Sequence, residues 1–327
     1  MNITFLRNIR LIGFTALLIS GYCLLLPYRL FAQPFAEAKD TVEIAVVVSR
    51  NISPYLSALD GFKEKMGDQG YRLNIAYYDL GGDMDAASSI VSQILKLDPS
   101  LVLTIGSEAT KAIGTQINTI PIVFSMSLDP FFGSRKRTNI TGSSMNVPIR
   151  TQVKELVNII PRMEKIGIVC SDVYYNRHLS GVQMAISLEF NVEFLTRFAE
   201  NEADFTEAVK QILPEIDVFL FVPDETLLSP RTMQFLLLES FRYNKPVVGP
   251  SLRFVQEGAL FALGSDYKDI GRQSAELAID ILQGKNAFQL PVTEARKAKL
   301  YLNRRTAKQI GIPIPQSVVS RVEKIFE

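Results

Sequence analysis

The sequence predicts an α/β protein of two lobes, each built around a parallel β-sheet. Apolar segments typical of buried strands alternate with amphipathic segments typical of helices along most of the chain. The two halves repeat the same order of segments. The length of 327 residues also suits about two domains better than one very large sheet.

The first half begins with a β-branched run at 42–49, the pattern of a strand that is buried on both faces. An apolar helical stripe follows and ends near Gly67 and Gly70. It is formed by Leu56, Leu59, Phe62 and Met66. Three further strands are predicted at 73–80, 101–107 and 121–127, with helices at 84–97 and 108–117. Asp83 is the expected N-cap of the first of these two helices.

In the second half, the periodicity predicts helices at 151–160, 202–213 and 231–244 and strands at 165–171, 192–199, 218–224 and 246–251. Segment 101–110 matches segment 218–227: each has an apolar strand, a tight turn, an acid (Glu108 or Glu225) and a helix start. The strands at 121–127 and 246–251 both begin with Pro. Two matches in the same order indicate two similar lobes.

The amino terminus has the order of a secretory signal peptide. Arg7 and Arg10 precede the uncharged apolar run 11–26, and small residues follow it. Cleavage at Ala32 removes residues 1–32, and Ala38 is a second candidate cleavage point. The alternative is a retained membrane anchor, because the run is close to the shortest length that spans a bilayer.

The mature chain has few residues for metal or disulfide chemistry. Removal of residues 1–32 changes the formal charge from +1 to −2, so nothing indicates nucleic-acid binding. Cys23 argues only weakly for lipidation, because Tyr22 stands where a small residue is needed. Cys170 then has no cysteine partner, and its apolar strand predicts a buried structural thiol. One His in the chain excludes Cys/His metal clusters.

Ligands of open parallel sheets bind beyond the carboxyl ends of the strands. The predicted strands end in hydroxyls, carboxylates and tyrosines there, and two such edges that face each other would form a cleft. The candidate ligand-binding residues are Ser49, Asn51, Ser107, Glu108, Ser125, Ser127, Tyr174, Tyr175, Asp224, Thr226 and Ser251. Helix-start amides could hold an anionic group and an acid could hold an ammonium. The alternative for each residue is a helix cap.

Catalytic motifs are missing from the sequence. It has no glycine-rich nucleotide loop and no G-x-S-x-G elbow. The acids in 79–85 lack the later bidentate ligand of a calcium loop, and a turn before a capped helix explains them better. His178 has no evident Ser or Cys partner and is interpreted as a loop residue at the cleft rim. We therefore expect neither an enzyme nor a cofactor.

Several segments resemble the substrate-binding proteins of ABC transporters, in the branch that includes tryptophan and tyrosine binders. They occur in family order across roughly 42–312 and are 105–113, 120–130, 139–144, 218–230, 257–285 and 300–312. The resemblance implies the type I periplasmic-binding-protein fold, with two Rossmann-like lobes, three crossover segments and a ligand in the cleft. Phe131 and Phe132 depart from the small residues usual after Asp129-Pro130, which leaves the ligand open.

On this resemblance, lobe 1 would comprise 42–145 and about 265–290, and lobe 2 would comprise 146–264 and about 291–327. Segment 139–148 would be the first crossover and 259–266 would return the chain to lobe 1. The tail from Pro291 would include the third crossover, whose exact position is left open. The helix after Tyr267 would pack on lobe 1 and end at Gly284.

The leading hypothesis is an exported, periplasmic, monomeric binding protein that delivers a small molecule to an ABC permease and its ATPase. An amino acid, possibly aromatic, fits the mixture of acids, helix-start amides and aromatic side chains. The alternative is a sensor that signals to a kinase, cyclase or chemoreceptor. An enzyme would need a nucleophile–base pair or a cofactor loop.

Overall fold

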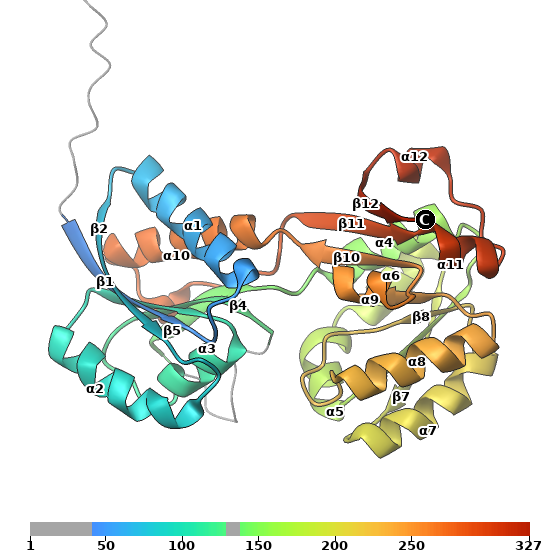
Figure 1. Ribbon diagram of the computed structural model, residues 1–327, viewed down its shortest axis with the longest axis horizontal. Helices are drawn as coiled ribbons and strands as arrows, with labels where there is room; N and C mark the ends of the chain where they lie inside the picture. The colour runs from blue at the N-terminus through green and yellow to red at the C-terminus, as the bar shows by residue number, and fades with distance from the viewer. Residues whose placement is uncertain (1–40, 129–137) are drawn as a thin grey trace, which may run out of the picture. The chain divides into compact units, whose positions relative to one another are not determined.

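The computed structural model describes residues 41–128 and 138–327 (Figure 1). Among these residues, the first sheet has five parallel strands in the order β2-β1-β3-β4-β5. Helices α1 (Ser53–Asp68), α2 (Ala87–Leu97) and α3 (Ser107–Gly114) connect its strands, and the short 3₁₀ turn η1 (Met84–Ala86) precedes α2. The strands are β1 (Thr41–Val48), β2 (Arg72–Asp79), β3 (Leu101–Ile105), β4 (Ile122–Ser127) and β5 (Ile140–Ser144).

The second sheet has seven described strands in the order β12-β11-β10-β9-β8-β6-β7. All neighbours are parallel except β10 and β11. The strands are β6 (Lys165–Cys170), β7 (Glu193–Phe198), β8 (Val218–Leu220), β9 (Val247–Gly249), β10 (Phe261–Ser265), β11 (Ala298–Asn303) and β12 (Val322–Phe326). Two mostly parallel α/β sheets confirm the predicted fold class.

Helical segments surround the second sheet and connect its strands. They are α4 (Ile149–Ile159), α5 (Asp172–Tyr174), the π-helical turn η2 (Tyr175–Leu179), α6 (Gln183–Phe190), α7 (Glu202–Ile212), η3 (Leu213–Glu215), α8 (Pro230–Arg242), α9 (Leu252–Gln256), α11 (Arg304–Gln309) and α12 (Gln316–Val319). The remaining helical segments are α10 (Tyr267–Leu282) and η4 (Ala287–Gln289).

The two halves of the chain repeat one topology. The order β2-β1-β3-β4-β5 corresponds to β7-β6-β8-β9-β10, so β3 matches β8 and β4 matches β9. These are the pairs whose sequences echo each other. The helix after the fifth strand of each half packs outside that half: α4 follows β5 but contacts α6, and α10 follows β10 but packs along α1 (Figure 1).

Helices α1 and α10 lie side by side over one face of the first sheet, in contact at two glycines. A Cβ on Gly61 would overlap the carbonyl oxygen of Lys268, and a Cβ on Gly271 would overlap that of Ala58. Large buried side chains, among them Phe62 and Met66, fill the space between these helices and the sheet. The predicted stripe on α1 therefore faces the core, although Leu56 of that stripe is 39% exposed.

Three predicted segments differ from the structure. Segment 259–266, predicted to return the chain to lobe 1, contains β10, an interior strand of the second sheet. The strand predicted at 218–224 ends at Leu220, because Pro223 has no N–H with which to extend the ladder. Residues 140–144, predicted within the first crossover, instead form the edge strand β5.

The Asp83 carboxylate accepts a hydrogen bond from the amide of Asp85 at 2.9 Å, which confirms Asp83 as a helix cap, although the first turn that it caps is 3₁₀.

Three connecting segments run beside one another. The amide of Ser144 donates to the carbonyl of Thr293 (2.7 Å) and the amide of Ala295 donates to that of Asn146 (3.0 Å). The amide of Asp266, between β10 and α10, donates to the carbonyl of Lys297 at 3.1 Å. Segment 291–297 is thus the third connection, whose exact position the sequence left open. The lobe boundaries stay a prediction, because residues 40–327 form one compact unit.

Candidate ligand-binding site

Ser49, which follows β1, joins two elements at the carboxyl edge of the first sheet. Its buried hydroxyl donates to the carbonyl of Ile105 (3.2 Å) and accepts from the amide of Ala109 (2.9 Å). The N-cap of α3 is Gly106, which has no side-chain oxygen, so Ser49 supplies the capping oxygen from a neighbouring strand. The Ser49 hydroxyl thus already donates one hydrogen bond and accepts another within the protein.

The other candidates at this edge are more accessible. Ser107 accepts through its hydroxyl from the amide of Leu128 at 3.1 Å. The Glu108 carboxylate lies 3.3 Å from the Arg50 guanidinium, and both side chains are about half exposed. Asn51 is exposed in the loop before α1. Because its charge is already paired, Glu108 is a weaker candidate for a ligand ammonium than its sequence position suggested.

Ser125 and Ser127 lie at the end of β4 with unused hydroxyls. Both residues are buried, and neither Oγ has a hydrogen-bond partner among residues 41–128 and 138–327. Met126 between them has a φ of 59°, and the pairing with β5 shifts register at this point. A buried hydroxyl without a partner carries a free-energy penalty, so this irregular strand end is a candidate ligand contact. Asp129, Phe131 and Phe132 lie outside the described residues.

Asp224 organises the corresponding edge of the second sheet. Its buried carboxylate accepts from the amide of Ser171 at 2.7 Å and from the amide of Thr226 at 3.0 Å. Ser171 in turn accepts from the amide of Tyr174 at 3.1 Å and caps α5. The Asp224 carboxylate therefore fixes the loop after β6 against the loop after β8, while Thr226 itself is exposed.

Two aromatic side chains follow β6. Burial, and to a lesser degree the nearby Asp224 carboxylate, raises the pKa of Tyr174, so its phenol stays neutral and can donate a hydrogen bond. The Tyr174 ring lies 4.6 Å from the His178 ring, measured between centroids. Tyr175 packs edge-on against Phe198 at 5.3 Å. Tyr174 is thus the better placed of the two tyrosines to contact a ligand.

A small cavity of about 120 Å³ lies at this carboxyl edge, beside the connecting segments. The connection after β5 supplies part of its wall, and Leu128 lies at the end of β4. The edge of the second sheet supplies the rest, including the predicted Ser251. Its lining includes Leu128, Met145, Asn146, Val147, Gln152, Pro223, Ser251, Phe254 and Leu263.

Two amide side chains in this lining have buried oxygens without partners. Asn146 donates through Nδ2 to the carbonyl of Leu128 (3.2 Å), and Gln152 donates through Nε2 to that of Val147 (2.8 Å). These bonds fix the orientation of both amides, because a flipped amide would place two oxygens against each other. Within the part of the chain that the structure describes, Asn146 Oδ1 and Gln152 Oε1 are left without a donor. The cavity wall therefore offers two acceptors for N–H or O–H groups.

A second cavity of about 250 Å³ shares Asn146, Val147 and Pro223 with the first. Its wall has an aromatic and apolar part, formed by Tyr174, His178, Val182 and Ile186. Arg150 and Glu189 form a bidentate ion pair in its lining (2.7 and 2.5 Å). The two adjoining cavities thus combine a polar wall with an aromatic one, which suits an amphipathic small molecule.

The described residues offer little other chemistry. Residues 41–128 and 138–327 contain no group of three or more His, Cys, Asp or Glu that could hold a metal ion. Burial raises the pKa of the Cys170 thiol to about 12, so it is a structural side chain, as predicted. No helix within these ranges is apolar enough over a sufficient length to span a membrane. The predicted signal peptide lies outside them.

Two α/β sheets, three connecting segments and a cavity beside them are the architecture that the sequence resemblance to solute-binding proteins implied. The family model for ABC transporter substrate binding proteins matches residues 41–325, so the chain belongs to that family. This confirms the resemblance and the family-level function.

Among curated proteins, a tyrosine-binding protein of Clostridioides difficile is 24% identical over 269 residues, 78% of this chain and 76% of its own. A Vibrio cholerae conserved domain protein is 25% identical (TM-score 0.62), with 88% of this chain and 100% of that chain covered. The fold is shared with a Streptococcus pneumoniae domain in complex with L-Trp, at 19% identity, TM-score 0.62 and the same coverage.

Asn146 and Gln152 were not among the residues predicted from the sequence. Asn146 is the second residue after β5, and a position just after a strand was the signal used for the other candidates. It was missed because residues 140–144 were interpreted as a crossover and not as a strand. Gln152 lies in the first turn of α4, where no sequence pattern marks a buried amide.

Proposed function

We propose that this protein binds an amino acid in the cavity beside the connecting segments and presents it to an ABC importer. The observation that carries the proposal is a pair of buried amide oxygens, Asn146 Oδ1 and Gln152 Oε1, which have no hydrogen-bond partner among the described residues. An α-ammonium supplies N–H donors to both, and charge-assisted hydrogen bonds of this kind are the strong ones.

The acids predicted to hold the ammonium have other contacts. The Asp224 carboxylate accepts from two main-chain amides and Glu108 is paired with Arg50. In the proposal, the neutral amide oxygens of Asn146 and Gln152 therefore accept the hydrogen bonds of the ammonium. Of the residues predicted from the sequence, we propose Ser125, Ser127 and Tyr174 as ligand contacts, and Ser251 as part of the cavity wall.

We propose an aromatic side chain for the amino acid. The adjoining cavity has Tyr174 and His178 in its wall, and aromatic rings favour edge and offset contacts with another ring. The tyrosine-binding relative and the L-Trp complex of the same fold support this choice. We further propose that the protein is exported and that residues 1–32 are cleaved. The mature protein would be an extracytoplasmic monomer that delivers its ligand to a permease and its ATPase and is not itself an enzyme.

The test is calorimetric titration of the purified protein with L-Tyr, L-Trp and L-Phe, and with the N-acetyl derivative of each. The free amino acids should bind, and the N-acetyl derivatives should bind at least tenfold more weakly, because acetylation removes the ammonium. If none of the twenty amino acids binds, the amino-acid proposal is overturned. Equal binding of the acetylated compounds overturns the role of the two amide oxygens.

Asn146→Leu tests the site directly, because it keeps the side-chain size and removes the acceptor. A hydrogen bond to a charged group contributes about 1.5–3 kcal/mol, which corresponds to a loss of roughly 10- to 100-fold in affinity. The matched control is Asn158→Leu on the exposed side of α4. Equal affinities of the two variants would argue against a ligand at Asn146.

A further inference from the structure

The second cavity of the candidate site, of about 250 Å³, contains a carboxylate that the proposed function leaves unused. Glu294 lies on the third connecting segment and lines this cavity together with Asn146 and Tyr174. Its carbonyl accepts from Gln273 Nε2 of α10 at 2.9 Å, and the next amide, that of Ala295, donates to the carbonyl of Asn146 at 3.0 Å. The main chain therefore holds Glu294 close to the residue whose amide oxygen carries the proposed function.

The Glu294 carboxylate has no partner among the described residues. It forms no ion pair and accepts no hydrogen bond there, and the basic side chains of Arg296 and Lys297 pair with Asp269 of α10 instead. Although Glu294 as a whole residue is exposed, protein atoms around its carboxyl raise its pKa by desolvation, and no neighbouring cation offsets this. Burial, and in smaller part the Glu294 charge, raises the pKa of Tyr174, so the carboxylate lies near that phenol. A carboxylate in this position is stabilised by a cation that binds beside it.

The other charged side chains that line the two adjoining cavities compensate each other. Arg150 and Glu189 form the bidentate ion pair described above, and the described lining of the smaller cavity has no Asp, Glu, Lys or Arg. With a neutral His178, Glu294 leaves the described lining with one uncompensated negative charge. No guanidinium or lysine ammonium among these residues is free to pair with a ligand carboxylate. Charge therefore favours a cationic ligand over an anionic one.

We propose that Glu294 is the counter-ion of the ligand ammonium and that the site therefore also binds primary arylalkylamines, which have no carboxylate. This inference rests on the proposed function, in which the same ammonium donates to Asn146 Oδ1. Neutral amide oxygens accept hydrogen bonds but do not compensate a charge, so an ammonium taken out of water also needs an anion nearby. Glu294 and Tyr174 line one cavity, which suits an ammonium and an aromatic ring joined by a short chain.

The experiment is calorimetric titration of the purified protein at pH 7 with L-Tyr, tyramine and hydroxyphenylpropionate. The three compounds share one ring and a two-carbon chain, and they carry both charged groups, the ammonium alone and the carboxylate alone. L-Trp, tryptamine and indolepropionate form a second matched set. We expect the amine of the better-bound set to bind within about tenfold of its amino acid. The corresponding propionate should not bind detectably, because it places a second negative charge beside Glu294.

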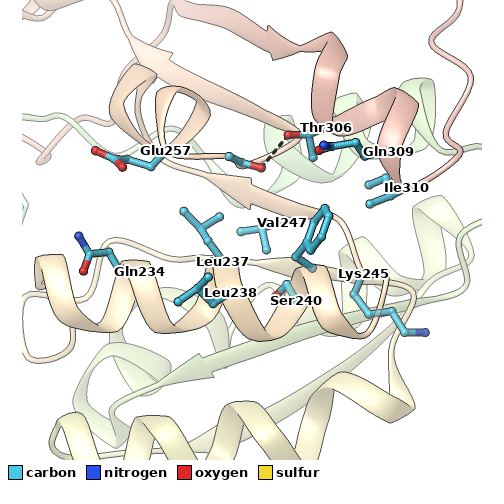
Figure 2. Close-up of a pocket in the computed structure, with 12 residues that line it drawn as sticks. Gln234, Leu237, Leu238, Ser240, Lys245, Val247, Glu257, Thr306, Gln309 and Ile310 are labelled. Carbon is cyan, nitrogen blue, oxygen red and sulfur yellow. Dashed lines mark hydrogen bonds between the residues drawn. The ribbon is translucent and has the colours of Figure 1, made fainter.

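Glu294→Gln keeps the shape of the side chain and removes its charge. It should weaken binding of the amino acid and of the amine by about tenfold, the lower end for a charged hydrogen bond, because Glu294 is exposed on one side. The melting temperature of the ligand-free variant should not fall, since the carboxylate has no partner to lose. Glu294→Asp keeps the charge and should retain more of the affinity. The matched control is Glu257→Gln, at an exposed residue in the lining of a different cavity of about 420 Å³ between α8 and α11 (Figure 2), which should leave both affinities unchanged.

The possible outcomes separate this inference from the proposed function. If the amino acid binds but the amine does not, or if Glu294→Gln binds both as tightly as the wild type, the role of Glu294 is overturned and the amino-acid proposal survives. A propionate that binds as tightly as the matching amine also overturns the role of Glu294. If the amines bind and no amino acid does, the amino-acid proposal alone is overturned. If neither class binds, both are overturned.

Discussion

Substitution of Gly271 by Ala should strongly destabilise the protein. The new Cβ overlaps the carbonyl oxygen of Ala58 and lies 2.7 Å from its carbonyl carbon. These are main-chain atoms of α1, which cannot rotate away as a flexible side chain can. Restoring ordinary contact at 3.4 Å or more would separate α1 from α10 by roughly 1.5 Å and loosen the packing over the first sheet.

The magnitude follows from two opposing terms. Overpacking of a buried contact costs about 1–3 kcal/mol, and a clash with backbone belongs at the upper end. Replacement of Gly by Ala within a helix returns up to about 1 kcal/mol. The net expectation is a loss of about 2 kcal/mol in the free energy of unfolding, or a melting temperature lower by roughly 4–8 °C.

The control is the same substitution at Gly67 of α1, where a Cβ would meet nothing within 4 Å and where φ is not positive. Gly67→Ala should leave stability unchanged or raise it by up to about 1 kcal/mol. Urea unfolding followed by circular dichroism measures both variants. If Gly271→Ala proves as stable as Gly67→Ala, the close contact between the two helices is not as described here.

Three further predictions concern other buried groups. The Cys170 thiol, whose pKa burial raises to about 12, should not react with a thiol reagent at pH 8 until denaturant is added; rapid labelling of the native protein would contradict its burial. Asp224→Ala should lower the free energy of unfolding by about 2–3 kcal/mol, because the amide of Ser171 loses its charged acceptor; unchanged urea unfolding would argue against this. Burial opposes ionisation of Asp269, but the hydrogen bonds from Arg296 lower its pKa overall. This ion pair therefore stabilises the fold at pH values above the ordinary aspartate pKa. The stabilisation is lost as the pH falls through the lowered pKa of Asp269. Asp269→Asn should therefore be less stable than the wild type at pH 7. If the difference between the urea midpoints of the variant and the wild type does not narrow below pH 3, the stabilising role of the ionised Asp269 is disproved.

Most strands were predictable because parallel sheets buried on both faces require continuous apolar runs. The run at 42–49 gave β1 nearly to the residue, and repeated proline-led runs gave β4 and β9. The strand β5 was missed because its sequence, Ile-Thr-Gly-Ser-Ser, is short and polar. Its burial comes from neighbours such as Phe124, which fills the space beside Gly142 and which no local pattern reveals.

Segment 172–190 was not predicted as helical for a related reason. Its helix α6 exposes Met184 (73%) and Leu188 (78%), so its apolar residues do not form one buried stripe. Periodicity identifies a helix only when one face is apolar and the opposite face is polar.

The candidate site was predictable by region but not by role. The predicted strand ends placed Ser125, Ser127 and Tyr174 at the carboxyl edges of the sheets, where the structure also has them, but their role as ligand contacts stays a proposal. A sequence cannot tell which polar side chain is already satisfied. The Ser49 hydroxyl and the Asp224 carboxylate accept hydrogen bonds from main-chain amides, whereas no described residue donates to the side-chain oxygen of Asn146. That distinction depends on hydrogen-bond partners distant in the sequence.

Helices α4 and α10 each pack on the other half of the fold, and this limits how far the chain can fold during its synthesis. The first sheet begins at Thr41, but the helix that covers it beside α1 ends only at Leu282. A growing chain therefore cannot complete the helices over its first sheet until most of the second sheet has been synthesised. A break between β5 and α4 would likewise leave the first sheet without α10, which stays on the carboxyl-terminal fragment without its partner α1, and we expect the two fragments to fold completely only when mixed.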